Sequence, residues 1–185
     1  MQRRSLLKAL LAAPFAGAAA LAHAQKKGLA MVEELQSTWR NYLAAGTPTP
    51  SPDEPLKLTE KEWKQRLSPA AFRVMREEGT ERAGTSPLDR EKRAGVFVCA
   101  GCDLPLYTSA MKFDSGTGWP SFFTTIPGVF GTKTDYLLIY PRTEYHCKRC
   151  GGHHGHLFKD GPAPTGLRYC NNGVALKFVP KEGQA

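Results

Sequence analysis

The chain has 185 residues, with 25 lysines and arginines against 17 aspartates and glutamates, for a formal net charge of +8. Three of the basic residues lie in the first 24 positions, so the remaining 161 residues carry a net charge of only +5. These charges are scattered and are not gathered beside aromatic side chains, which argues against a nucleic-acid-binding protein. The length suffices for one domain with a hydrophobic core, and we expect a monomer.

Residues 1–24 have the layout of a bacterial export signal. A basic head containing Arg3 and Arg4 precedes a weakly apolar run over 9–22, and the segment closes on an A-x-A cleavage motif at Ala24. The adjacent arginines resemble those of twin-arginine signals, and the alternative is an ordinary secretory signal that happens to contain them. Because the apolar run is too short to span a membrane, we expect a periplasmic protein with no stable membrane insertion after cleavage.

The next segment is predicted to be an amphipathic helix followed by a stiff linker. Apolar residues from Leu29 to Leu43 recur at helical spacing, which predicts a helix over 28–45 in an N-terminal segment that we assign to residues 25–46. Residues 47–56 contain four prolines. These prolines exclude a helix or a central strand and predict a semi-rigid connection.

Beyond the linker, the sequence predicts two short helices and then strands. Thr59 opens a capping box, and Ser68 is an N-cap followed by a proline at the first helical position. The strands are short runs of β-branched and aromatic residues bounded by glycine or proline. The predicted elements are helices at about 60–67 and 69–78 and strands at 95–99, 135–140 and 174–179. Since strands and helices do not alternate, we expect a mainly β domain of antiparallel sheets preceded by short helices.

Four of the five cysteines form two similar C-x-x-C motifs, VCAGCD and HCKRCGG. A tight turn at each motif can direct two sulfurs at one point, and four thiolates complete the tetrahedral shell of zinc without an open position for substrate. We therefore expect one structural Zn²⁺ that adds to folding stability. Disulfides and reactive dithiols are the alternatives. The expected ligands are Cys99, Cys102, Cys147 and Cys150.

Cys170 is then the only thiol left to react. In a strand, Arg168 would share its face and favour the thiolate, and Asn172 offers an amide in the following turn. His153 and His156 would share one face of a helix but lie on opposite faces of a strand, so spacing alone does not decide whether they converge. Histidines beside a free thiol can act as its acid or base. The alternative is that Cys170 is a small buried hydrophobe.

The segment FDSGTGWPSFF places Trp119 in a turn between a glycine and a proline, with Phe122 nearby. An indole in such a turn can present its face at the surface of a cleft. Packing in the core is an equally good explanation of these aromatic residues when they are considered alone.

Together these segments resemble the methionine-R-sulfoxide reductases, enzymes that reduce the R epimer of methionine sulfoxide in proteins. The resemblance rests on VCAGCDLPLY, KFDSGTGWPSF and YHCKRCGGHHGHLFKDGPAPTGLRYCNNGVALKF in this order and covers residues 58–180. It implies a pair of antiparallel sheets, with the zinc ion away from the reaction centre, and oxidised proteins as substrates. We assign residues 57–182 to this reductase domain.

The resemblance also implies roles for individual residues. The matches are Cys170 for the catalytic cysteine, Trp119 for the indole that contacts the substrate methyl group, with Phe122 as its apolar neighbour, His153 and His156 for the histidines that line the pocket, and Arg168 and Asn172 for the polar residues that flank the nucleophile. A thiolate to attack sulfur, a group to protonate the oxygen and an apolar surface for the methyl group are what reduction of a sulfoxide requires.

One position departs from the family pattern. Many members carry a cysteine just before the GW of GWPSF, where it resolves the oxidised catalytic cysteine as a disulfide, and this chain has Thr117 there. The sequence therefore predicts that an external thiol, from a thioredoxin-like domain or a small molecule, reduces the sulfenic acid. The competing functions are a zinc-stabilised binding module without catalysis and a thiol-disulfide oxidoreductase that uses a C-x-x-C motif.

Overall fold

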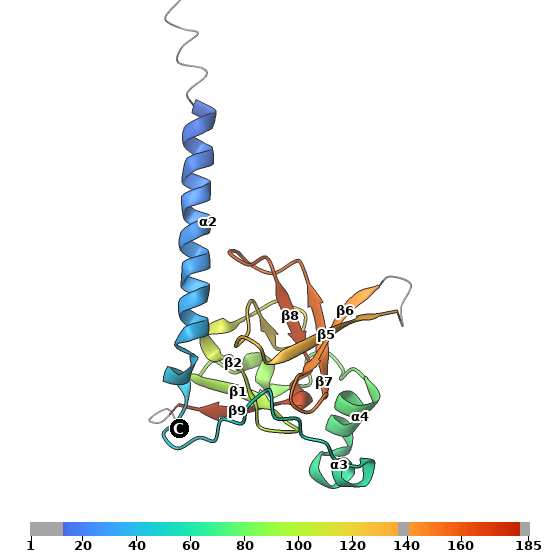
Figure 1. The fold of residues 1–185 in the computed structure, drawn as a ribbon. Coiled ribbons are helices and arrows are strands. Elements are labelled where there is room, and N and C mark those ends of the chain that lie inside the picture. Colours follow the sequence, from blue (N-terminus) through green and yellow to red (C-terminus); the bar gives the residue numbers. More distant parts are fainter. Residues whose placement is uncertain (1–12, 137–140, 182–185) are drawn as a thin grey trace, which may run out of the picture.

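A computed structural model describes residues 13–136 and 141–181 (Figure 1). Its strands form a three-stranded and a six-stranded sheet, and every pairing is antiparallel. The predicted class, a mainly β fold of two antiparallel sheets with few helices, is therefore confirmed. The strands in chain order are β1 (Gly95–Cys99), β2 (Pro105–Thr108), β3 (Lys112–Phe113), β4 (Ser121–Phe122), β5 (Phe130–Asp135), β6 (Arg142–Cys147), β7 (His153–Phe158), β8 (Arg168–Asn171) and β9 (Leu176–Pro180).

The three-stranded sheet has the order β2-β1-β9, and the six-stranded sheet has the order β3-β4-β8-β7-β6-β5. The strand predicted at 95–99 is β1, with every residue assigned as expected. The strand predicted at 174–179 begins two residues later, because Gly173–Ala175 form a 3-10 turn. Of the strand predicted at 135–140, Asp135 is the last residue of β5, Tyr136 is not in a strand, and residues 137–140 lie outside the described residues.

Aromatic side chains fill the space between the two sheets. The ring of Phe122, from β4, stacks on Tyr107 with centroids 3.8 Å apart and meets Phe97 edge-on at 5.1 Å. All three side chains are fully buried. Residues that alternate along a strand point to opposite faces, so Phe122 faces this core while its neighbour Ser121 faces the other side of β4.

Two short helices precede the strands, as predicted. In α3 (Glu60–Arg66) the side chain of Thr59 accepts a hydrogen bond from the Glu62 N–H, and the Glu62 carboxylate accepts one from Thr59 N–H at 2.7 Å. This reciprocal pair is the expected capping box. Ser68 caps α4 (Pro69–Glu77), whose buried face packs on the hydrophobic core.

The N-terminal helix differs from the prediction in extent. Helix α2 (Ala13–Ser37) begins well before position 25, and a short 3-10 helix (Trp39–Tyr42) follows it, so the α-helix ends earlier than expected. Figure 1 shows α2 projecting from the domain, with its C-terminal end against the sheets. The Gln36 amide donates to Thr124 Oγ1 at 2.8 Å. Among the described residues, no helix is both long and apolar enough to cross a membrane.

The proline-rich segment 47–56 has no helix or strand, as predicted, but it lies against the domain. The N–H of Leu56 donates to the Arg149 carbonyl at 2.8 Å, and Lys148 Nζ pairs with Asp53 at 2.6 Å. The side chain of Leu56 also packs against the hydrophobic core. The segment therefore ties α2 to the rest of the domain across the turn that follows β6.

Gly155 sets how closely β7 approaches β8. It pairs with Asn171, and a Cβ atom at this position would lie 1.9 Å from the carbonyl oxygen of Cys170. Such a contact forces backbone atoms apart. Only glycine therefore permits the observed pairing of the two central strands.

We predict that Gly155→Ala lowers the free energy of unfolding by about 3 kcal/mol, because overpacking in a close-packed interior costs roughly that amount. Urea unfolding followed by circular dichroism measures the change. Gly166→Ala is the matched control: its φ is +67° but open space surrounds it, so only about 1 kcal/mol is expected. Equal losses in the two variants would contradict the proposed close approach.

Candidate functional site

The four paired cysteines form one buried cluster at the ends of β1 and β6. The Sγ atoms of Cys99 and Cys150 lie 3.6 Å apart, as do those of Cys102 and Cys147, and all four sulfurs lie within 4.8 Å of one another. A disulfide requires about 2.05 Å between sulfurs, so none of these pairs is bonded. The close pairs also join different motifs, which argues against a reactive C-x-x-C dithiol.

The geometry fits a tetrahedral metal ion. Sulfur ligands about 2.3 Å from zinc lie about 3.8 Å from one another, close to the 3.6 Å of the two short pairs. Four thiolates would repel each other without a cation between them. Three arginines also donate hydrogen bonds to backbone carbonyls of the two cysteine turns. Arg76 and Arg149 donate to the carbonyls of Cys150 and Cys102 at 2.9 and 3.1 Å, and Arg66 donates to the Gly101 carbonyl. The cluster could therefore hold one metal ion that joins the two sheets.

We predict that the purified protein contains one metal ion per chain and that Cys147→Ser loses it. Because metal binding adds to folding free energy, this variant should lose more than about 5 kcal/mol of stability, as should wild type after prolonged chelation. Elemental analysis and urea unfolding check both. Cys170→Ser is the control and should keep its metal. Full metal content in Cys147→Ser would contradict the assignment.

Cys170 lies apart from this cluster, half-buried in a cavity on the six-stranded sheet. Its strand, β8, pairs with β4 on one side and with β7 on the other, so Cys170 stands opposite both Ser121 and His156. Directly paired residues of antiparallel strands project to the same face. The cavity is lined by Thr80, Trp119, Arg142, Gly155, His156, Phe158, Cys170, Asn171 and Asn172.

The thiol of Cys170 is held in its protonated form. Burial raises its pKa above the ordinary value of a cysteine, and the guanidinium of Arg168 and the hydroxyl of Thr117, which lower the pKa, do not offset burial. Arg168 therefore favours the thiolate of Cys170, as expected, but the effect of burial on the pKa is larger. The hydroxyl of Thr117 lies beside the sulfur of Cys170.

A β-bulge decides the question that spacing left open for the two histidines. Tyr145 pairs with Gly155 and His146 pairs with His153, so one extra residue, His154, interrupts the register of β6 and β7. An extra residue shifts the alternation of a strand by one position. His153 and His156 therefore share a face, with ring centroids 5.5 Å apart.

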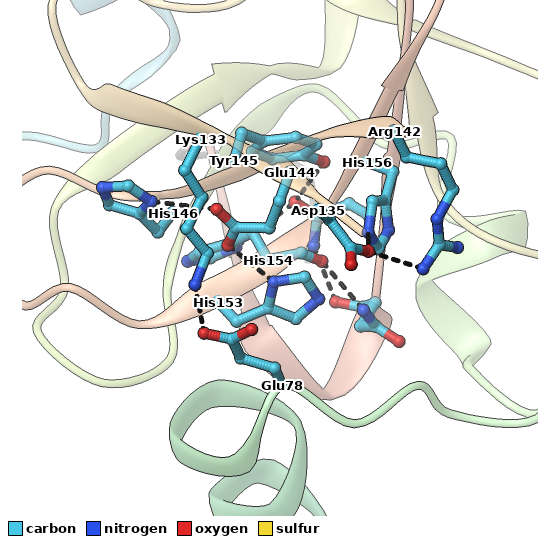
Figure 2. A network of polar contacts seen from close by, with 12 residues as sticks. Glu78, Lys133, Asp135, Arg142, Glu144, Tyr145, His146, His153, His154 and His156 are labelled. Carbon is cyan, nitrogen blue, oxygen red and sulfur yellow. Dashed lines mark hydrogen bonds and ion pairs between the residues drawn. The ribbon is translucent and has the colours of Figure 1, made fainter. Parts of the chain in front are cut away.

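Each of these histidines has a carboxylate partner, and the sequence had indicated neither. Figure 2 shows Glu144 between two imidazoles: His153 Nδ1 donates to its carboxylate at 2.7 Å and His146 Nδ1 at 3.0 Å. Burial raises the pKa of Glu144, but these hydrogen bonds outweigh burial and lower the pKa to about 2. His153 Nε2 is buried and has no hydrogen-bond partner among the described residues.

His156, which lines the cavity, is oriented by Asp135. Its Nε2 donates to the Asp135 carboxylate at 2.7 Å, and Arg142 donates to the same oxygen at 2.6 Å (Figure 2). Burial lowers the pKa of His156, and the bond to Asp135 offsets this only in part. The ring is therefore neutral near pH 7, and its imidazolium form is a stronger acid than that of an exposed histidine.

The flanking polar residues are fixed by hydrogen bonds. The guanidinium of Arg168 donates two hydrogen bonds to the Asp160 carboxylate, each at 2.8 Å. It also lies 4.3 Å from the ring centroid of Phe158, which pairs with Arg168 on β7. Asn172 lines the cavity, but its Oδ1 accepts the Glu81 N–H at 2.9 Å and its Nδ2 donates to a backbone carbonyl at 2.9 Å. Both side chains therefore support the walls of the cavity.

The structure does not bring every expected residue to the cavity. Trp119, His156, Cys170 and Asn172 line it, whereas His153 and Arg168 are not among the lining residues. Phe122 is fully buried between the sheets and cannot contact a substrate in the cavity. The prediction that it binds the substrate beside Trp119 is therefore wrong. Phe158 supplies the second aromatic surface of the cavity. It lies two residues after His156, so a prediction of strand β7 would have placed both side chains on the same face.

Two antiparallel sheets, a buried cluster of four cysteines that could hold a metal ion, and a separate cysteine in a cavity define the class of this β protein. A model of the SelR domain matches residues 67–180. The chain belongs to the methionine-R-sulfoxide reductase B family.

Several relatives support this membership over most of the chain. The peptide methionine sulfoxide reductase MsrB of Thiobacillus denitrificans is 47% identical over 133 residues, covering 71% of this chain and 99% of the relative. The MsrB of Pseudomonas putida is 49% identical over 128 residues, covering 68% and 95%. The chloroplastic peptide methionine sulfoxide reductase B1 of Arabidopsis thaliana is 45% identical over 145 residues, covering 74% and 72%.

Proposed function

We propose that this peptide-methionine (R)-S-oxide reductase reduces methionine-R-sulfoxide residues of proteins through a sulfenic acid on Cys170. The observation that carries the proposal is the direct pairing of Cys170 with His156 on adjacent strands, in a cavity that Trp119 also lines. The four remaining cysteines are gathered in the buried cluster and are not available for the reaction.

The chemistry requires only the groups in the cavity. Cys170 transfers its proton to His156 and attacks the sulfoxide, and the S–O bond to methionine breaks as the oxygen passes to the cysteine sulfur. His156 returns the proton to that oxygen, so that thiol and sulfoxide become sulfenic acid and thioether. Methionine sulfur is reduced by two electrons and Cys170 is oxidised by two.

Each wall of the cavity supports one part of this step. Trp119 and Phe158 provide apolar surface for the S-methyl group. The lowered pKa of His156 favours proton delivery to the oxygen. Thr117 and Arg168 stabilise the thiolate as it forms. We assign His153, held by Glu144, to supporting the orientation of His156.

The metal of the cluster is proposed to be zinc in a structural role. Four thiolates fill a tetrahedral shell, so no position is open for substrate. None of the four cysteines lines the cavity. Zinc would hold the ends of β1 and β6 together, and the catalytic residues would act on substrate without it.

An external thiol is proposed to complete the cycle. The first thiol displaces water from the sulfenic acid to give a mixed disulfide, and the second releases Cys170 and leaves as a disulfide. A thioredoxin-like domain or a small thiol can supply both. The basic head and apolar run of residues 1–24 support a periplasmic location and a role in repair of oxidised exported proteins.

Turnover of the two epimers tests the proposed function. With dithiothreitol as reductant, wild type should reduce a peptide containing the R sulfoxide and leave the S sulfoxide unchanged. Cys170→Ser should fold normally and lose more than about a thousandfold in kcat, as expected when a nucleophile is removed. Equal activity of the two proteins, activity only on the S epimer, or unfolding of Cys170→Ser would contradict the proposal and favour a non-catalytic module.

Trapping experiments test the missing resolving cysteine. After one equivalent of R sulfoxide, wild type should give a dimedone adduct on Cys170, detected by mass spectrometry. Thr117→Cys should instead give an intramolecular disulfide with Cys170, because Thr117 stands beside that sulfur. Thr134→Cys, on exposed β5, adds a thiol without proximity and should behave as wild type. An intramolecular disulfide in wild type would refute the external-thiol step.

A further inference from the structure

Glu81 connects the two sides of the cavity, although it belongs to none of the motifs quoted from the sequence. It belongs to the connection between α4 and the 3-10 helix Pro87–Arg90, and only 8% of it is exposed. Its backbone and its carboxylate together make four hydrogen bonds to two distant parts of the chain. One part carries the indole, and the other follows the nucleophile.

The backbone of Glu81 holds two side chains that line the cavity. Its carbonyl accepts the indole N–H of Trp119 at 3.2 Å, and its N–H donates to Asn172 Oδ1 at 2.9 Å. A single peptide segment thus orients the apolar wall and the amide beside the nucleophile. Any displacement of Glu81 moves both.

The carboxylate of Glu81 fixes the turn that follows Cys170. Its two oxygens accept the N–H groups of Gly173 at 2.6 Å and Val174 at 3.0 Å. The loop presses closely on this turn, since a Cβ atom at Gly173 would lie 1.9 Å from Ser86 Oγ. Each oxygen takes one backbone donor, so both acceptor atoms of the side chain are used.

We propose that Glu81 is a positioning residue that sets the separation between the indole of Trp119 and the thiol of Cys170. The inference rests on the proposed function, in which one group holds the methyl and the other attacks the sulfur. The indole and the thiol must be held at one spacing, and a misplacement of about 1 Å costs about a hundredfold in rate. Glu81 itself touches no reacting atom.

Glu81→Gln tests this role with little change in size. The amide retains one acceptor and turns an NH₂ group toward a backbone N–H, so the turn should shift. For the R-sulfoxide peptide we expect kcat to fall by about tenfold to a hundredfold and KM to rise. Glu91→Gln is the matched control, because Glu91 also accepts backbone N–H groups, from Lys92 and Arg93, just after that 3-10 helix, and it does not line the cavity. It should stay within about twofold of wild type.

A spectroscopic signature separates positioning from general loss of stability. With 5-fluorotryptophan incorporated, the chain gives three ¹⁹F resonances, and Trp119→Phe assigns one of them. In Glu81→Gln the Trp119 resonance should shift while those of Trp39 and Trp63, which lie in the core, stay in place. In Glu91→Gln all three should match wild type.

Wild-type kinetics and an unshifted Trp119 resonance in Glu81→Gln would overturn the inference, as would equal losses in Glu81→Gln and Glu91→Gln. If Glu81→Gln does not fold, Glu81→Asp carries the test: it keeps both acceptors but is one methylene shorter, so a smaller loss of kcat and a shifted resonance are expected. Wild-type behaviour of Glu81→Asp would then overturn the inference. Absence of turnover in wild type would instead refute the proposed function.

Discussion

The placement of β8 between β4 and β7 is the constraint on which the site depends. Antiparallel pairing fixes what stands beside each residue of a strand, so Cys170 faces the same side as His156 on one neighbour and Ser121 on the other. Gly155 lets the two strands approach closely enough for this pairing. The thiol is thus held by an inner strand of a six-stranded sheet and not by a loop, so hydrogen bonds to both neighbouring strands fix its position.

Local signals in the sequence were sufficient for much of the fold. Capping at Thr59 and Ser68 defines helices without reference to the rest of the chain, and matched C-x-x-C motifs indicate a metal centre wherever they meet. The convergence of His153 and His156 could not be read from spacing, because it depends on a bulge created by pairing with a distant strand. Phe122 was misplaced for a related reason: only the orientation of β4 decides which sheet face an aromatic residue occupies.

Buried charges in the site occur in matched groups. Glu144, which is 2% exposed, accepts from two imidazoles, and Asp135 accepts from His156 and Arg142. An isolated charge at such depth would be costly, and its hydrogen-bonded partners remove most of that cost. The same groups fix which ring nitrogen carries the proton. Fold stability and the direction of proton transfer therefore rest on the same hydrogen bonds.

The pairing of β1 with β9 has a consequence for how the chain acquires its structure. The central strand of the three-stranded sheet, Gly95–Cys99, takes one of its two partners from Leu176–Pro180, the last strand among the described residues. Contacts between segments so distant in sequence make folding slow. During synthesis this sheet stays incomplete until position 180 has left the ribosome. Until then Cys99 also lacks its pairing partner Leu176, so the cysteine turn that follows β1 is not yet supported. Completion of the three-stranded sheet therefore follows the synthesis of every strand of the six-stranded sheet.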